Sequence, residues 1–335
     1  MNLIRIENLS KHFVINKRQS GIGGVIKSMF KPERLLKKAV DSIDMQIAAG
    51  EIVGFIGPNG AGKSTTIKML TGILVPTAGT VEVGGIVPYK QRKAYTKNIG
   101  VVFGQRTQLW WNLPVDESFD LLRTIYRIPR PAYQKNIELF TEVLGIDEFL
   151  HMPVRQLSLG QRMRCEIAAS LLHNPKVVFL DEPTIGLDVV AKERIREFIA
   201  KINRETGVTV ILTTHDMSDI EKLCKRIVII DLGKIIYDGN IDEIKDRFGK
   251  DRMLVVDFDE PATIQDCDLH TTMKTEGLRR LILFNRDKIS AIDLITKLSA
   301  QYKINDFALQ ETEIDNIIRH IYENKTESAA VLRAI

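Results

Sequence analysis

The residues best suited to chemistry lie in one glycine-rich segment, which follows an apolar run and precedes a stretch with helical spacing. The segment reads Gly57-Pro58-Asn59-Gly60-Ala61-Gly62-Lys63-Ser64-Thr65. It matches G-x-x-x-x-G-K-[ST], in which glycines let backbone amides surround phosphate oxygens at a helix N-terminus. Lys63 would reach the β- and γ-phosphates of a nucleotide, and the Ser64 hydroxyl would be a ligand of Mg²⁺. A chain of this length contains the bare pattern by chance roughly once in a hundred, so we predict a nucleotide-binding loop.

Two adjacent carboxylates follow a second apolar run, Val177-Val178-Phe179-Leu180-Asp181-Glu182. Four apolar residues predict a buried strand, whose carboxyl end is where ligands bind in open α/β sheets. Asp181 would hold Mg²⁺ through water, and Glu182 would polarise the attacking water. The alternative is a carboxylate pair that begins a helix before Pro183. The phosphate loop upstream favours the catalytic interpretation.

A third segment, LSLGQ at 157–161, precedes another stretch with helical spacing. Ser158 is a good N-cap residue, and backbone amides at a helix start can hold a phosphate oxygen. Taken alone, the segment indicates no more than a capped helix. Its interpretation depends on the other motifs.

In their order along the chain, these segments resemble the motifs of an ABC-transporter ATPase subunit. The resemblance covers about residues 1–245 and joins the phosphate loop, Gln105, LSLGQ, VVFLDEPTIGLD and His215. It implies that Gln105 is a Mg²⁺ ligand, that Asp188 is the D-loop aspartate and that His215 contacts the γ-phosphate. It also places Phe13 where an aromatic residue stacks on adenine. Considered singly, His215 would more often be a structural histidine and Phe13 a core residue.

The family resemblance also implies a dimer that binds ATP and Mg²⁺. Two subunits pack head to tail, and each ATP lies between the phosphate loop of one and three residues of the other, here Ser158, Gly160 and Gln161. Hydrolysis would open the pair and drive integral-membrane permease subunits. Leu159 replaces the first glycine of the family's usual LSGGQ, but Gly160 keeps the second. We therefore expect binding across the dimer to be retained.

The apolar pattern predicts an α/β fold with a mainly parallel sheet. The family resemblance implies that this is a P-loop NTPase core with an N-terminal antiparallel β part and a helical subdomain. Strand-like runs at 52–56, 99–103, 177–180, 208–212 and 227–230 alternate with helical segments. Residues 1–15 predict two short strands. Helical spacing over about 106–172, including Val115, Phe119, Leu122 and Tyr126 on one face, predicts the subdomain. We assign 1–249 to the ATPase domain and 250–335 to a small α+β extension.

The extension shows a β-β-α-β-α pattern, with strands at 253–258, 278–284 and 304–309 and helices at 291–302 and 314–321. This pattern and the ending DFALQETEIDNIIRHIY look like the extension of ATPases that serve ABC-2-type exporters, a looser resemblance than that of the core. We expect an exporter with ABC-2-type permease subunits. An importer ATPase is the nearest alternative, because only the tail separates the two.

Residues 17–38 form a basic insert that a minimal domain of this family lacks. It holds seven cations and one acid, for a net charge of +6, whereas the whole chain has +4. Helical spacing of Ile22, Val25, Ile26, Met29 and Phe30 predicts a short amphipathic helix for a membrane or membrane partner. The alternative is a solvated insertion that folds onto its own domain.

Trp110 and Trp111 follow Gln105 closely, in a region that lines the permease-docking groove in ABC ATPases. Adjacent tryptophans of a helix or strand cannot both face one core. We expect at least one of them in the core and the other at a docking surface.

Composition narrows the class and the compartment. The chain has 335 residues, 44% of them hydrophobic and 27% charged, as expected for a globular protein. No apolar run approaches the roughly 18 residues of a membrane span, and its three cysteines cannot all pair. We expect a cytoplasmic subunit held at the inner face of the membrane by its permease, without nucleic-acid partners.

Two rival classes of protein are disfavoured. A non-catalytic module would not need intact Lys63, Asp181, Glu182 and His215. Soluble ABC ATPases that act on ribosomes or DNA usually carry two cassettes or long coiled coils. This sequence shows neither, which disfavours that class.

Overall fold

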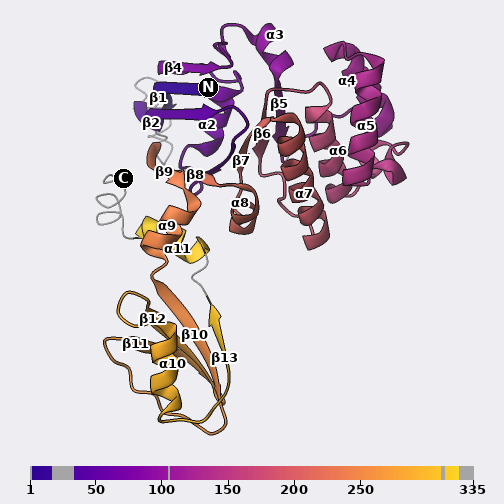
Figure 1. Ribbon diagram of the computed structural model, residues 1–335. Helices are drawn as coiled ribbons and strands as arrows, with labels where there is room; N and C mark the ends of the chain where they lie inside the picture. The colour runs from indigo at the N-terminus through magenta and orange to yellow at the C-terminus, as the bar shows by residue number, and fades with distance from the viewer. Residues whose placement is uncertain (1, 17–33, 105, 311–313, 324–335) are drawn as a thin grey trace, which may run out of the picture. The chain divides into compact units, whose positions relative to one another are not determined.

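The computed structural model describes residues 2–16, 34–104, 106–310 and 314–323. The chain forms two compact units, Met1–Asp238 and Gly239–Ile335, which we describe separately (Figure 1). The helix of the basic insert expected over residues 22–30 and the Gln105 side chain lie outside the described residues.

A six-stranded sheet forms the centre of the first unit. Its order is β5-β6-β7-β3-β8-β9. The strands are β3 (Ile52–Ile56), β5 (Ile99–Phe103), β6 (Val177–Asp181), β7 (Thr209–Thr213), β8 (Arg226–Asp231) and β9 (Lys234–Asn240). The pairs β3·β7, β3·β8, β5·β6 and β6·β7 are parallel, and β6 and β7 are buried on both faces. The predicted mainly parallel sheet is confirmed, because near-continuous apolar strands need cover on both sides.

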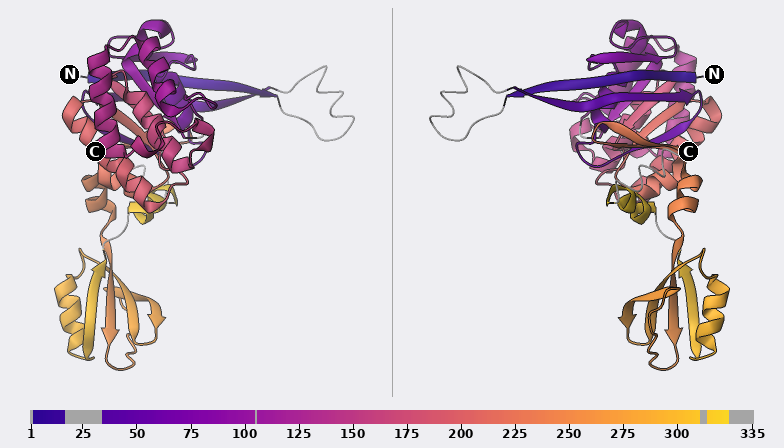
Figure 2. Two further views of the ribbon diagram at one scale, coloured as in Figure 1. Left: turned by 90° about the vertical axis from the view of Figure 1, so that its right-hand side faces the viewer. Right: turned by 90° about the vertical axis from the view of Figure 1, so that its left-hand side faces the viewer.

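A second, antiparallel sheet has the order β2-β1-β4, with β1 (Asn2–Asn16), β2 (Arg34–Ala48) and β4 (Ala78–Val83). The prediction of two short strands in residues 1–15 was wrong. One long strand forms instead, because shifts of register around Leu9 and Lys11 absorb the break in the apolar pattern. Figure 2 shows β1 and β2 extending together beyond the rest of the first unit. The far part of this ribbon exposes Phe13, Val14, Ile15, Leu35 and Leu36.

One buried cluster joins the two sheets. It contains Ile4 and Ile47 from the antiparallel sheet, Ile67 from α2 (Lys63–Leu70), and Phe55 and Phe179 from one face of the parallel sheet. This cluster packs α2 against both sheets. The first turn of α2, where the phosphate loop ends, therefore has a fixed position.

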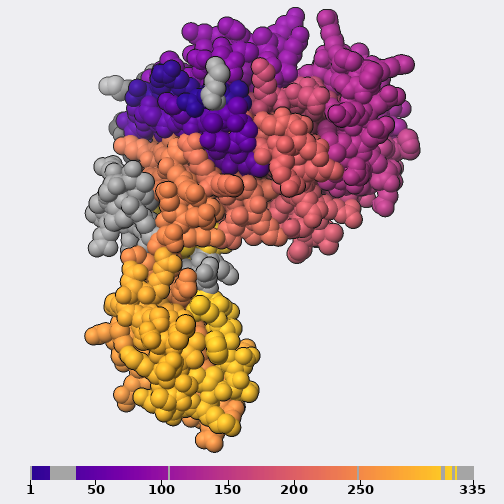
Figure 3. All heavy atoms as spheres, viewed as in Figure 1, coloured from indigo at the N-terminus to yellow at the C-terminus, as the bar shows by residue number. Residues whose placement is uncertain are grey.

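The remaining helices of the first unit cover the parallel sheet or form the helical subdomain. The subdomain contains α4, α5 and α6 and appears in magenta and rose at one end of the unit (Figures 1 and 3). The bounds are α3 (Arg92–Tyr95), η1 (Thr96–Asn98), α4 (Val115–Tyr126), α5 (Arg130–Leu144), η2 (Asp147–Phe149), η3 (Val154–Gln156), α6 (Leu159–Leu171), α7 (Val189–Thr206) and α8 (Met217–Leu223). Val115, Phe119 and Leu122 are buried along one face of α4, as the spacing predicts.

Both tryptophans are exposed, Trp110 by 38% and Trp111 by 48%, so the expectation of a core role for one of them was wrong. They lie in a loop instead of a helix or strand, and the neighbouring Leu109 takes the buried position. The Trp111 ring lies 5.6 Å from the guanidinium carbon of Arg162 on α6.

The second unit contains a four-stranded sheet of order β11-β12-β10-β13. Its elements are α9 (Ile241–Phe248), β10 (Asp251–Phe258), β11 (His270–Glu276), β12 (Arg279–Asn285), α10 (Ala291–Ser299), β13 (Ile304–Gln310) and α11 (Ile314–Glu323). Leu254, Ile282 and Leu294 belong to the cluster that packs α10 on the sheet. The β-β-α-β-α pattern lacked β11, whose residues are almost all exposed and therefore show no apolar alternation. In the described part of the chain, no helix is long and apolar enough to cross a membrane.

Candidate nucleotide site

The phosphate loop joins β3, which ends at Ile56, to α2, which begins at Lys63. Two of its glycines cannot be replaced without movement of the backbone. A Cβ on Gly57 would lie 2.2 Å from the carbonyl oxygen of Ile230. Gly62 has a φ of 118°, and a Cβ there would lie 2.6 Å from the carbonyl oxygen of Ala39. The spacing of glycines is thus required by the packing of the loop as well as by any phosphate.

Lys63 lies beneath this loop, only 7% exposed. Its Nζ donates to the carbonyl oxygen of Gly57 at 2.5 Å and to that of Pro58 at 3.2 Å. Burial lowers the pKa of Lys63, while the charges of Glu182 and Asp181 act in the opposite direction. The ammonium group of lysine is a compact positive charge that can bind a phosphate oxygen.

Asp181 is the last residue of β6, and its carboxylate is oriented by the neighbouring strand. The Thr213 hydroxyl donates to Oδ1 of Asp181 at 2.5 Å. The Gly104 amide donates to the Asp181 carbonyl oxygen at 2.9 Å. Thr213 therefore fixes Oδ1 of the carboxylate, and Oδ2 accepts neither of these two hydrogen bonds.

Glu182 follows immediately and has a φ of 56°, in the left-handed region that few side chains adopt. Its amide donates to the carbonyl oxygen of Thr213 at 2.9 Å. Its Oε1 lies 2.8 Å from Nε2 of His215. A carboxylate and an imidazole in hydrogen-bond contact can hold and move a proton.

Several of the candidate residues line one cavity of about 500 Å³. It is lined by Ser64, Lys68, Ile73, Leu74, Phe103, Gly104, Arg106, Asp181, Glu182 and Ile185. Ser64 from the first turn of α2 and Asp181 from the end of β6 therefore line the same cavity, as the order of motifs implies. Gly104 and Arg106, the two neighbours of Gln105, also line it.

The oxygen donors in this cavity fit Mg²⁺. The Ser64 hydroxyl and the carboxylates of Asp181 and Glu182 are the hard ligands that this ion prefers. The described residues contain no cluster of three or more His, Cys, Asp or Glu side chains that could hold a metal ion. In Mg²⁺ sites, one or two protein oxygens, water and substrate phosphates usually complete the shell.

Other candidate residues lie elsewhere in the first unit. Ser158 and Gln161 form a capping box at the start of α6: the Gln161 amide donates to Ser158 Oγ at 3.2 Å, and the Ser158 amide donates to Gln161 Oε1 at 2.9 Å. Neither they nor Gly160 line the cavity just described.

Asp188 is exposed and caps α7, accepting from the Ala191 amide at 2.8 Å. Phe13 is 37% exposed, with Lys11 Nζ 5.4 Å from its ring centroid.

Thr213 was missed by sequence reasoning, and so were the residues that support the loops around the site. Thr213 precedes His215 by two positions, and nothing in that spacing identifies Asp181 as its partner. Glu166 on α6 was also missed. It accepts from the Thr107 hydroxyl and, at 3.1 Å, from the Gln108 amide, and so ties the segment after Gln105 to the helix that begins at LSLGQ.

A glycine-rich loop between a central parallel strand and a helix, with carboxylates at the end of a nearby parallel strand, defines a P-loop nucleoside triphosphatase. Within that class, a family model described as "ABC transporter" matches residues 40–185. The chain belongs to the family of ABC transporter ATP-binding proteins, as its curated relatives also show. It is thus an ATP-binding subunit of an ABC transporter.

The names of two relatives point to different processes, resistance to a drug in one and import in the other. The daunorubicin resistance ATP-binding protein DrrA3 of Streptomyces coeruleorubidus is 34% identical over 291 residues, which is 85% of this chain and 91% of the relative. The methionine import ATP-binding protein MetN 2 of Enterococcus faecalis is 34% identical over 223 residues, or 65% and 64% of the two chains. A solved dimeric ATP-binding cassette, bound to ADP and Pi in a post-hydrolysis state, is 27% identical. It has a TM-score of 0.59 and covers 71% of this chain and 98% of its own.

Proposed function

We propose that this protein hydrolyses ATP with Mg²⁺ to power transport through separate permease subunits, and that the transport is export. The observation that carries the hydrolytic part is the contact between Glu182 and His215, 2.8 Å apart, at a cavity that Ser64 and Asp181 share. A site that only bound nucleotide would not need a proton-accepting pair at this position.

Each residue then has a role in the reaction. The phosphate loop, from Gly57 to Thr65, binds the β- and γ-phosphates through its amides and through Lys63. Glu182 orients the attacking water and accepts its proton, and His215 contacts the γ-phosphate. Ser64, Gln105 and Asp181 are the residues that would hold Mg²⁺, which when bound neutralises charge on the β- and γ-phosphates. Phe13 stacks on adenine.

We further propose a head-to-tail homodimer, or a pair with a second ATPase subunit. Ser158, Gly160 and Gln161 lie away from the cavity of their own chain and would complete the site of the partner. Asp188 would lie near the dimer interface. The dimeric state of the solved relative bound to ADP and Pi supports this arrangement.

Export is favoured by the extent of the match to the daunorubicin resistance protein. That match spans 291 residues, more than the first unit contains, and therefore extends into the C-terminal extension. The match to the methionine importer covers 223 residues. We propose ABC-2-type permease partners and a position at the cytoplasmic face of the membrane, with residues 1–249 as the ATPase domain and 250–335 as the extension.

The test is co-purification of tagged Glu182→Gln protein with ATP from detergent-solubilised membranes of its own host. Stoichiometric integral-membrane chains without an extracytoplasmic binding protein are the expected result. A co-purifying extracytoplasmic binding protein would favour import instead. Recovery with ribosomal or DNA-bound partners alone would contradict the transport role, while an ATPase assay of the wild-type chain tests the chemistry separately.

A further inference from the structure

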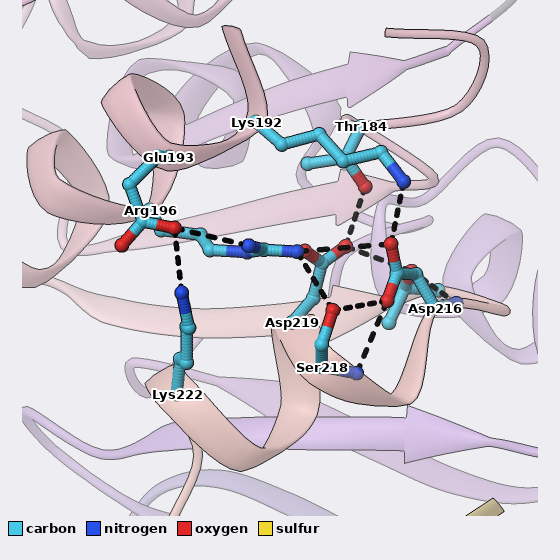
Figure 4. A network of polar contacts seen from close by, with 9 residues as sticks. Thr184, Lys192, Glu193, Arg196, Asp216, Ser218, Asp219 and Lys222 are labelled. Carbon is cyan, nitrogen blue, oxygen red and sulfur yellow. Dashed lines mark hydrogen bonds and ion pairs between the residues drawn. The ribbon is translucent and has the colours of Figure 1, made fainter. Parts of the chain in front are cut away.

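One carboxylate that does not line the cavity accepts hydrogen bonds from residues close in sequence to Glu182 and to His215. Asp219 lies on α8 and is fully buried. The Thr184 hydroxyl donates to its Oδ2 at 2.5 Å, and the Thr214 hydroxyl donates to the same oxygen at 3.0 Å. Figure 4 shows Asp219 between Thr184 and Arg196. Its Oδ2 atom is therefore shared by two segments that are distant in sequence.

The two threonines are close in sequence to the proposed catalytic groups. Thr184 follows Glu182 by two positions, and Thr214 immediately precedes His215. Both hydroxyls belong to side chains that are only 3% exposed. Asp219 consequently fixes, through one hydroxyl each, the chain just after Glu182 and the chain just before His215.

The charge of Asp219 is compensated from α7. Arg196 Nε donates to Oδ1 of Asp219 at 2.6 Å, and the arginine is itself only 6% exposed. A buried carboxylate needs such a partner and further hydrogen bonds, and losing either is costly. Arg196 thus binds Oδ1, and the two threonine hydroxyls donate to Oδ2.

Further contacts hold α7 and α8 together around the Arg196–Asp219 ion pair (Figure 4). Lys192 Nζ donates to Asp216 at 2.5 Å, Arg196 donates to the Ser218 hydroxyl at 2.9 Å, and Lys222 donates to Glu193 at 2.7 Å. The helix that supplies Arg196 begins directly after its N-cap Asp188. The network therefore gives Asp219 a rigid position relative to both loops.

We propose that Asp219 is a positioning residue for ATP hydrolysis. Acting through Thr184 and Thr214, it holds Glu182 and His215 at the separation in which the pair can act on water and the γ-phosphate. It does not line the cavity described above. This inference rests on the proposed ATPase function and adds a residue that determines the geometry of the same site.

The test uses Thr184→Val and Thr214→Val in the full-length chain. Valine has nearly the shape of threonine, and both variants leave the Arg196–Asp219 ion pair in place. Thr209→Val is the matched control: Thr209 is also fully buried, at the other end of β7, and its hydroxyl accepts from the Gly50 amide at 2.8 Å. We expect each of the first two variants to lower kcat about tenfold with little change in KM for ATP. The control should keep the wild-type kcat.

A second measurement separates positioning from general destabilisation. In a His215→Ala background, followed by single-turnover release of labelled phosphate, Thr214→Val should cause no further loss of rate, because its effect passes through His215. An additional tenfold loss in that background would overturn the inference. So would wild-type kcat in both valine variants, or an equal loss in Thr209→Val. A wild-type chain without ATPase activity would instead overturn the proposed function itself.

Discussion

Nε2 of His215 lies 2.8 Å from Oε1 of Glu182, although the two residues follow different strands. The cause is the parallel register of β6 and β7, which places Asp181 opposite Thr213. Glu182 follows Asp181 by one position and His215 follows Thr213 by two, so both lie at the same edge of the sheet. We therefore expect the two side chains to act on the same substrate atoms.

Replacing Glu182 by glutamine should remove proton acceptance and keep the shape of the side chain. We expect ATP hydrolysis to fall at least about a hundredfold while ATP binding persists, because the phosphate loop is unchanged. Steady-state phosphate release and equilibrium binding of labelled ATP measure the two effects. Glu197→Gln, an exposed site on α7, is the control. Hydrolysis by Glu182→Gln at the wild-type rate would refute the assignment.

Gly160→Ala should separate folding from assembly. An added Cβ would lie 3.5 Å from Cβ of Ala191, an ordinary contact, so the melting temperature should hardly change. If Gly160 approaches phosphate in a partner subunit, the same methyl group should weaken ATP-dependent dimerisation and lower ATPase activity.

Gly57→Ala provides the contrast for this experiment. Its Cβ would lie 2.2 Å from the Ile230 carbonyl oxygen, so both stability and nucleotide binding should fall. Size-exclusion chromatography with light scattering, with and without ATP, reports dimerisation. A Gly160→Ala protein that dimerises and hydrolyses normally would argue against a role in the partner's site.

Asp216 should make stability depend on pH in the acid range. Burial acts to raise its pKa, but hydrogen bonds from Lys192 and Ser218 prevail and lower the pKa to about 2 from 3.8. Because the folded pKa is depressed, the stabilisation is complete above the unfolded pKa and is lost as the pH falls towards 2. After allowance for solvent screening, it amounts to about 1–2 kcal/mol.

The measurement is the free energy of unfolding of wild type and Asp216→Asn in urea between pH 6 and pH 3. The difference between the two proteins should shrink as the pH is lowered. Asp147→Asn, which removes an exposed carboxylate in the same unit, is the control for the loss of one negative charge. A constant difference for Asp216→Asn across the range would contradict the prediction.

Glu166 should hold the loop that carries both tryptophans of the chain. The Thr107 hydroxyl and the Gln108 amide donate to its carboxylate, and burial raises its pKa in spite of these bonds. Glu166→Ala should release the loop and cost about 1–3 kcal/mol of stability. Since Trp110 and Trp111 are the only tryptophans, their fluorescence reports on this loop alone. We expect easier quenching by acrylamide, whereas Thr206→Val, at a hydroxyl bonded within α7, should leave quenching unchanged.

Much of the core fold could be predicted, because the phosphate loop and the Asp181–Glu182 pair each follow a strongly apolar run. The strand before Asp181 and the helix after the phosphate loop are examples. The strand β11 could not be predicted, since an exposed edge strand has no apolar face. The position of Asp219 could not be predicted either. Its partners Thr184 and Arg196 are distant in sequence, and only the packing of α7 and α8 brings them together.

Glu182 has a backbone conformation that only glycine adopts without strain. Holding a larger residue there costs on the order of 1 kcal/mol. Glu182→Gly should therefore melt at a higher temperature than Glu182→Gln, since both variants lack the carboxylate but only the glutamine keeps the strain. Selection for thermal stability alone would therefore favour glycine at this position.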